Sequence, residues 1–288
     1  PELGQAMVED VGLRVVQPSI PQREKWPPNL RQRNMTRFLE MSQKDRPPWI
    51  THVIWPETAA TLFVEEDVSM RRAMAAVIPD GGLLLTGAPR RQATPPTLWN
   101  SLLVVDKSGA VAEAYDKAHL VPFGEYVPFR KFLALDKGVQ GQLDYSPGEG
   151  ARTLRLQGLP PVSALICYEV VFPSRVIDAA DPPAWMLNVT NDAWYGETAG
   201  PHQHLAIARV RAVEEGRPLV RATNTGISAV VDAYGRTLHS LGLNDEGVID
   251  SRLPAATRNA TIFARSRDLG LFVMLAGVLF SAFFAGRL

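Results

Sequence analysis

Three residues that together could perform nucleophilic chemistry each follow a stretch of sequence that predicts a strand. Cys167, the only cysteine in the chain, comes directly after the apolar run 162–166. Glu57 and Lys117 follow two other such runs, and Pro56 stiffens the exit that leads to the carboxylate. Because side chains just beyond strand ends gather in a cleft at the edge of a sheet, we expect a thiol, a carboxylate and an ammonium to meet there.

These side-chain types match what covalent catalysis by a thiol requires. A carboxylate can accept the thiol proton and later return it to a leaving group, and an ammonium can lower the thiol pKa and stabilise an oxyanion. The segment 172–177 reads as the start of a helix, whose N–H groups would favour a thiolate at Cys167. Taken singly, each residue also has an ordinary interpretation: Cys167 as a small core residue, and Glu57 and Lys117 as solvated loop charges.

The elements that must position these residues alternate between strands and helices, with a hairpin among them. The turn 107–109 separates the apolar runs 100–106 and 111–115, which is a hairpin signal. Helical patterns occupy 26–43, 64–78 and 202–215. This mixture indicates an α/β layered domain with a mixed sheet rather than a purely parallel one.

Charge and histidine placement argue against two classes of function. Thirty basic residues balance thirty acidic ones among 288, with no long block of one sign, so nothing predicts a nucleic-acid partner. His119, His202 and His204 have no acidic or cysteine partner at ligand spacing, so no metal site is predicted. A single cysteine rules out an internal disulfide.

The C-terminal segment has the composition of a membrane helix. Residues 269–286 carry no charge and show no polar stripe, and a helix of this length rises about 27 Å, close to the ~30 Å hydrocarbon core of a bilayer. We therefore expect a membrane span at this end. The apolar and basic segment 129–135, preceded by Phe123 and Tyr126, is expected to dip into the lipid interface or, alternatively, to pack over the sheet as a flap.

Four motifs give the chain a resemblance to the nitrilase (carbon–nitrogen hydrolase) superfamily. They are W-P-E at 55–57, Y-D-K-x-H-L at 115–120, I-C-Y-E at 166–169 and N-x-T-N-D-A-W-Y-G at 188–196. The likeness covers roughly residues 12–250 and implies an αββα sandwich that carries a Glu-Lys-Cys triad. In that reading Cys167 is the nucleophile, Glu57 the general base and acid, and Lys117 the cation beside the oxyanion.

A narrower resemblance is to the apolipoprotein N-acyltransferase family. It rests on a membrane helix after the domain and on the motifs Q-P-S-I-P-Q-x-x-K-W (17–26), V-P-F-G-E-Y-V-P (121–128), C-Y-E-x-x-F-P (167–173) and R-A-T-N-T-G-I-S-A-V (221–230). The resemblance implies a linker over 1–11 from an N-terminal membrane region, a nitrilase-like catalytic domain over 12–262 and a transmembrane helix over 268–287. It implies a bacterial inner membrane location with the domain on the periplasmic side. The arginines that flank the last span, taken alone, would favour the cytoplasmic side.

The reaction of that family supplies the expected partners and further site residues. A phospholipid, usually phosphatidylethanolamine, gives an acyl chain to the cysteine as a thioester. The α-amine of the diacylglyceryl-modified N-terminal cysteine of an apolipoprotein then takes it, with no cofactor or metal. The resemblance also implies functional positions for Glu125, Tyr168, Glu169 and Trp26, with the Tyr168 N–H as a second oxyanion donor. Glu125 could orient Lys117 or accept a proton from the incoming amine.

Alternatives stay open at this level. Glu169 also fits a helix-capping role, and Trp26 fits a packing role at a domain edge. A membrane-tethered amidase or nitrilase would use the same three reactive residues with water as the attacking group. A non-enzymatic nitrilase-like module would need a broken triad, whereas all three residues are present here.

Overall fold

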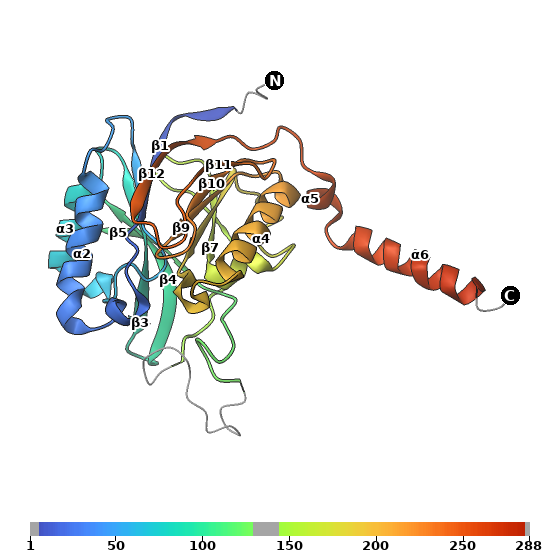
Figure 1. Ribbon diagram of the computed structural model, residues 1–288, viewed down its shortest axis with the longest axis horizontal. Helices are drawn as coiled ribbons and strands as arrows, with labels where there is room; N and C mark the ends of the chain where they lie inside the picture. The colour runs from blue at the N-terminus through green and yellow to red at the C-terminus, as the bar shows by residue number, and fades with distance from the viewer. Residues whose placement is uncertain (1–5, 129–143, 286–288) are drawn as a thin grey trace.

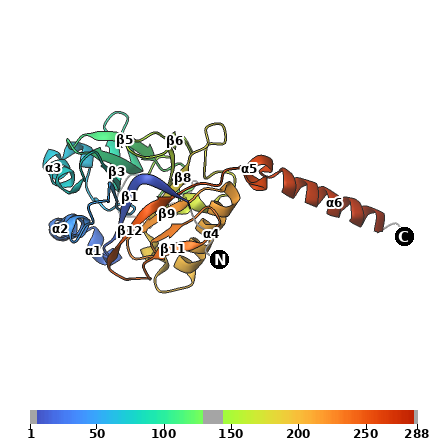
Figure 2. The same ribbon diagram turned by 90° about the horizontal axis from the view of Figure 1, so that it is seen from above.

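Two β-sheets lie face to face between helices in the computed structural model, which describes residues 6–128 and 144–285 (Figures 1 and 2). The strands of the first sheet are β1 (Met7–Gln17), β2 (His52–Ile54), β3 (Leu83–Gln92), β4 (Thr97–Asp106), β5 (Val111–Asp116) and β12 (Gly247–Pro254). The strands of the second are β6 (Thr153–Leu154), β7 (Val162–Ile166), β8 (Trp185–Thr190), β9 (Leu219–Thr223), β10 (Ala229–Val231) and β11 (Thr237–Ser240). Their spatial orders are β12-β1-β2-β3-β4-β5 and β11-β10-β9-β8-β7-β6.

Both sheets are mixed, as the sequence predicts. In the first, β1, β2 and β3 run parallel. Strand β4 is antiparallel to β3, and β5 is antiparallel to β4 through the predicted hairpin at 107–109. In the second, β7, β8 and β9 are parallel and β10 is antiparallel to β9. The first sheet is completed by β12, which pairs antiparallel with β1, and buried Arg14 binds Asp250 across this pair at 2.8 and 2.7 Å.

The apolar faces of the two sheets form the central core. Every residue of β2 and β8 is buried, which is typical of parallel strands covered on both faces. Side chains such as Leu13 and Leu85 from the first sheet pack in one cluster with Ile166 and Leu187 from the second. Burying one such side chain contributes about 1.5–3 kcal/mol to stability. Cys167 belongs to the same cluster, so the thiol is held against the core.

Helices cover the outer faces of the sandwich (Figures 1 and 2). The first sheet is covered by α2 (Pro28–Gln43) and α3 (Val68–Val77), and the second by α4 (Gly200–Glu215). The side chain of Asp67 caps α3 by accepting from Met70 N at 2.9 Å, so the predicted helix 64–78 is divided into a 3₁₀ turn, η1 (Val64–Glu66), and α3.

The chain after Cys167 differs from the sequence prediction. The helix expected from 172 is absent from this described segment, and a 3₁₀ helix, η2 (Cys167–Val171), begins at the cysteine itself. Phe172 is extended, with φ −92° and ψ 106°, because Pro173 disfavours the α conformation for the residue before it. The prediction of a helix start over 172–177 was therefore wrong.

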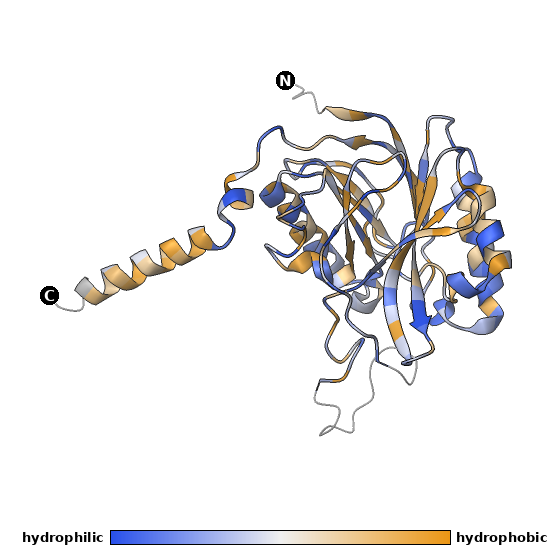
Figure 3. Ribbon diagram, turned by 180° about the vertical axis from the view of Figure 1, so that it is seen from behind, coloured by the Kyte–Doolittle hydropathy of each residue, from blue (hydrophilic) through white to orange (hydrophobic). Residues whose placement is uncertain are grey.

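The C-terminal helices lead away from the sandwich (Figures 1 and 3). After the short α5 (Ile262–Ser266), the helix α6 (Leu269–Ala285) is apolar all round, and it exposes large side chains such as Leu271, Phe272 and Phe280. Across residues 6–128 and 144–285, no helix has both the length and the apolar character needed to cross a membrane, so the predicted span over 268–287 is not confirmed. The predicted interfacial segment 129–135 lies outside the described residues.

Candidate active site

A cavity of about 290 Å³ lies where strands of both sheets end. Six of the seven predicted site residues line it: Trp26, Glu57, Lys117, Glu125, Cys167 and Tyr168. Glu57 and Lys117 follow β2 and β5 of the first sheet, whereas Cys167 follows β7 of the second. The cavity therefore forms between two sheets, not along the edge of one sheet as the sequence analysis expected.

The Glu57 carboxylate is held by donors from both sheets. Its Oε1 accepts from Asn100 Nδ2 at 2.8 Å, and its Oε2 accepts from Asn191 N at 2.8 Å. The loop that carries Glu57 packs directly against the backbone of Gly87 in β3. Only glycine fits there, because a Cβ at Gly87 would lie 2.4 Å from Thr58 N. Glu57 is 6% exposed, and it lines the cavity while each of its two oxygens has a fixed donor.

Lys117 lies between two carboxylates. Its Nζ is 3.0 Å from Glu125 Oε1 and 3.6 Å from Glu57 Oε1, and Asn100 Nδ2 also donates to Glu125 at 2.9 Å. Burial alone would lower the pKa of Lys117, but the charges of Glu57 and Glu125 outweigh burial and raise it. The ammonium therefore stays charged at neutral pH and balances a site that collects negative charge.

Cys167 is buried in a conformation that few residues other than glycine adopt. Its φ is +51°, and it is 8% exposed at the first position of η2. Burial, followed by the charge of Glu57, raises the pKa of the thiol to about 12, although Lys117 and a hydrogen bond from Thr190 act in the opposite direction. The expectation that this turn favours the thiolate was therefore wrong, because desolvation exceeds the help of nearby donors.

Glu169 is the predicted site residue that lies away from the cavity. Its Oε1 accepts from Tyr115 OH at 2.9 Å and from Ala118 N at 2.7 Å, and its Oε2 accepts from Ile166 N at 2.8 Å. The last contact caps η2, as the alternative interpretation of Glu169 anticipated. The side chain ties the segment after Lys117 to the turn of Cys167, and thus the cation to the nucleophile.

Lys25 is a cavity residue that the sequence analysis did not single out. It ends α1 (Gln22–Lys25), is 5% exposed, and donates from Nζ to the carbonyl oxygen of Glu57 at 3.0 Å. Burial lowers its pKa to about 8, although the charge of Glu57 acts to raise it. Asn100, which bridges two carboxylates, was missed as well. Lys25 stands within the Q-P-S-I-P-Q-x-x-K-W motif (17–26) but was given no role, and an asparagine within a strand carries no sequence signal.

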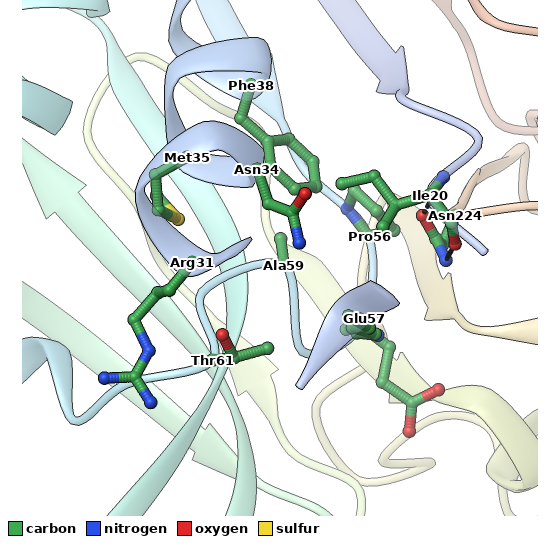
Figure 4. Close-up of a pocket in the computed structure, with 11 residues that line it drawn as sticks. Ile20, Arg31, Asn34, Met35, Phe38, Pro56, Glu57, Ala59, Thr61 and Asn224 are labelled. Carbon is green, nitrogen blue, oxygen red and sulfur yellow. Dashed lines mark hydrogen bonds between the residues drawn. The ribbon is translucent and has the colours of Figure 1, made fainter. Parts of the chain in front are cut away.

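A second, much smaller cavity lies behind Glu57, under α2 (Figure 4). Its volume is about 10 Å³, which is room for about one water molecule. Figure 4 shows the Glu57 side chain directed away from Asn34 and Phe38, so the carboxylate belongs to the larger cavity. Of these two cavities, only the larger has room for more than about one water molecule.

Comparison with known proteins shows which family and which named proteins this chain is similar to. A family model described as carbon-nitrogen hydrolase matches residues 13–263. Similar curated proteins include two that are named apolipoprotein N-acyltransferase. The first, from Rhodopseudomonas palustris, is 41% identical and the match covers 95% of this chain and 53% of the relative. The second, from Bradyrhizobium diazoefficiens, is 39% identical with 94% and 53% covered. The chain spans about half the length of the curated relatives it matches.

Solved structures share the architecture at lower identity. A mutant of the Nesterenkonia AN1 amidase, from the nitrilase superfamily, is 20% identical with a TM-score of 0.64, and the match covers 94% of this chain and 99% of that one. A member of branch 10 of the nitrilase superfamily from Saccharomyces cerevisiae is 19% identical with a TM-score of 0.63, covering 86% and 93%. At these identities the likeness shows the fold, a nitrilase-like sandwich of two mixed sheets.

Proposed function

The chain belongs to the carbon–nitrogen hydrolase family, and from this we propose that it transfers acyl groups through a thioester at Cys167, as an apolipoprotein N-acyltransferase. The observation that carries the proposal is the convergence of a thiol, a carboxylate and a charged ammonium on one cavity of about 290 Å³. The names of the curated relatives supply the acceptor class, a lipoprotein.

In the first half-reaction we assign Glu57 as the base that makes the thiol reactive. A pKa of about 12 leaves almost no thiolate at neutral pH, so the proton must leave as the sulfur attacks the ester carbonyl of a phospholipid. The oxyanion that forms is stabilised by Lys117 and by the backbone N–H of Tyr168. The C–O bond then breaks, Glu57 returns the proton to the leaving oxygen, and a lysophospholipid departs from the Cys167 thioester.

The second half-reaction reverses the direction of proton flow at the sulfur. The α-amine of a diacylglyceryl-cysteine attacks the thioester, Glu57 accepts the amine proton, and the C–S bond breaks to give an amide. The proton returns to the sulfur and restores the thiol. Glu125 serves by holding Lys117, to which it lies 3.0 Å away, so that the cation faces the oxyanion in both steps.

The cavity lining supports a lipid acyl donor such as phosphatidylethanolamine. Trp26, Tyr168, Trp194 and Tyr195 line it, and Trp194 and Tyr195 are 54% and 38% exposed. Aromatic groups with a polar end suit the boundary between lipid and water. This surface offers an acyl chain an apolar route to the sulfur.

We also propose the placement of the protein. The domain over 12–262 would carry out the chemistry on the periplasmic side of a bacterial inner membrane. The linker expected over 1–11 overlaps β1, which begins at Met7, so the residues before Met7 would link the domain to membrane helices. Helix α6, which exposes Leu275, Val278 and Phe280, would sit in lipid, because water would solvate such an apolar surface poorly.

The test uses the intact protein in detergent with phosphatidylethanolamine labelled in its acyl chain. We expect an intact-mass adduct on Cys167 that hydroxylamine removes and that moves to a diacylglyceryl-cysteine peptide. Cys167→Ser should form no thioester and Glu57→Gln should form it very slowly, whereas Glu149→Gln, an exposed carboxylate, should match the wild type. Steady hydrolysis of small amides without an adduct from phospholipid would instead identify an amidase.

A further inference from the structure

A buried histidine holds the backbone of the nucleophile from behind. His204, on α4, is 3% exposed, and its Nε2 lies 3.2 Å from the carbonyl oxygen of Cys167. A carbonyl oxygen only accepts hydrogen bonds, so Nε2 must carry the hydrogen and donate it. The nucleophile thus has a side-chain partner on its main chain that comes from a helix outside the sheets.

Two further buried side chains fix the ring of His204. Its Nδ1 lies 2.9 Å from Asp192 Oδ1, at the start of η3 (Asp192–Tyr195), and 3.0 Å from Arg221 Nη2 of β9. The same Nη2 donates to Asp192 Oδ2 at 2.7 Å, and Arg221 also donates to Asn188. The Arg221 and Asp192 side chains are both 0% exposed, so the ring has one orientation available.

This contact controls the direction of a second group. Because the peptide unit is planar and trans, the carbonyl of Cys167 and the N–H of Tyr168 point in opposite directions. Fixing the carbonyl toward His204 therefore aims the N–H away from His204. The φ of +51° at Cys167 is a conformation that costs about 1–3 kcal/mol for a residue with a side chain, so the unit needs an outside partner to stay in it.

We propose that His204, held by Asp192 and Arg221, is a positioning residue that locks the Cys167–Tyr168 peptide unit and so aims the Tyr168 N–H at the oxyanion. The inference rests on the proposed function, in which that N–H stabilises the tetrahedral intermediate. Because both half-reactions pass through such an intermediate, His204 acts on both. It acts through the backbone of the nucleophile, by its contact with the Cys167 carbonyl.

The experiment compares two reactions of the same thiol in the intact protein in detergent. Acylation by p-nitrophenyl butyrate forms an oxyanion, whereas alkylation by iodoacetamide displaces iodide without one. We expect His204→Leu to slow acylation about 10- to 100-fold, since loss of a whole oxyanion donor costs about 10²–10³. Alkylation should change less than about threefold. His204→Gln, whose amide can donate from a similar position, should recover most of the acylation rate.

Controls separate this inference from a structural role. His202→Leu, on the exposed side of the same helix, should leave both rates unchanged. Should His204→Leu fail to fold, Asp192→Asn serves in its place, with the same selective loss of acylation expected. Acylation at the wild-type rate in the leucine variant would overturn the inference. So would equal losses in both reactions without recovery by glutamine. A wild-type protein that forms no butyryl adduct would refute the proposed function itself, and the inference with it.

Discussion

The reactivity of Cys167 toward an alkylating reagent should reveal a thiol that is hard to ionise. Its pKa of about 12, against an ordinary value of 9, means that the thiolate is about 4 kcal/mol less favourable in the folded protein. At pH 9 the thiolate fraction is then about 10⁻³, compared with about one half for the unfolded chain. Alkylation of the folded protein at pH 9 should be about 500-fold slower on this ground alone.

The assay is the rate of iodoacetamide incorporation between pH 7 and 10.5, followed by intact mass, with the urea-unfolded protein as reference. We expect the folded rate to rise about tenfold per pH unit without a plateau, because the pKa lies above the range. The unfolded rate should reach half its maximum near pH 9 and level off above about pH 10. Restricted access to Cys167 lowers the whole folded curve but does not bend it, so the shape of the curve reports the pKa.

Glu57→Gln sharpens the same prediction, because its two effects have opposite sign. Removing the carboxylate removes the second cause of the high thiol pKa, so alkylation between pH 8 and 10 should become faster. Acyl transfer should nevertheless fall by about 10²-fold or more, since the general base is gone. A folded rate that reaches half its maximum at pH 8 or below would refute the reasoning, and so would slower alkylation in Glu57→Gln.

Two further predictions concern the polar groups around the reactive residues. Asn100→Leu should lower the rate of acyl transfer about tenfold or more and destabilise the protein by about 1–3 kcal/mol, because Glu57 and Glu125 lose a shared donor. Kinetics measure the rate and urea unfolding measures the stability, and an unchanged rate would contradict the prediction. The pKa of Asp192 is lowered to about 2 by Arg221 and His204, which outweigh burial, so the carboxylate contributes about 2 kcal/mol above pH 4 that is lost as the pH falls toward 2. Asp192→Asn should therefore flatten the fall in unfolding free energy between pH 4 and 2, and an unchanged slope would argue against the assigned pKa.

The layered fold was predictable because its signals are local. The turn at 107–109 defines a hairpin by itself, and the apolar runs at 162–166 and 184–189 are long enough to mark buried strands. The strand order was not predictable, since pairing such as that of β12 with β1 depends on side chains far apart in the sequence. The helix expected after Cys167 failed at Pro173, where a local rule opposed the pattern.

The features of the site likewise divide into those that the sequence predicts and those that it does not. Position beyond a strand end was enough to suggest Glu57, Lys117 and Cys167, and the cavity brings them together. Sequence could not give the sign of the thiol pKa, because that depends on how completely the turn is desolvated. It also could not find His204 as a partner of the nucleophile, since nothing in a histidine on a helix shows which carbonyl it faces.

The pairing of β12 with β1 has a consequence for the synthesis of the protein. A ribosome releases residues 247–254 well after Cys167, yet without them the first sheet lacks the strand that Arg14 anchors through Asp250. Until then β1 is an open edge, able to pair with a wrong neighbour, and its long-range closure is intrinsically slow. The growing chain thus contains every reactive group before it can hold them in place. Catalytic competence should arrive in one late step rather than by degrees.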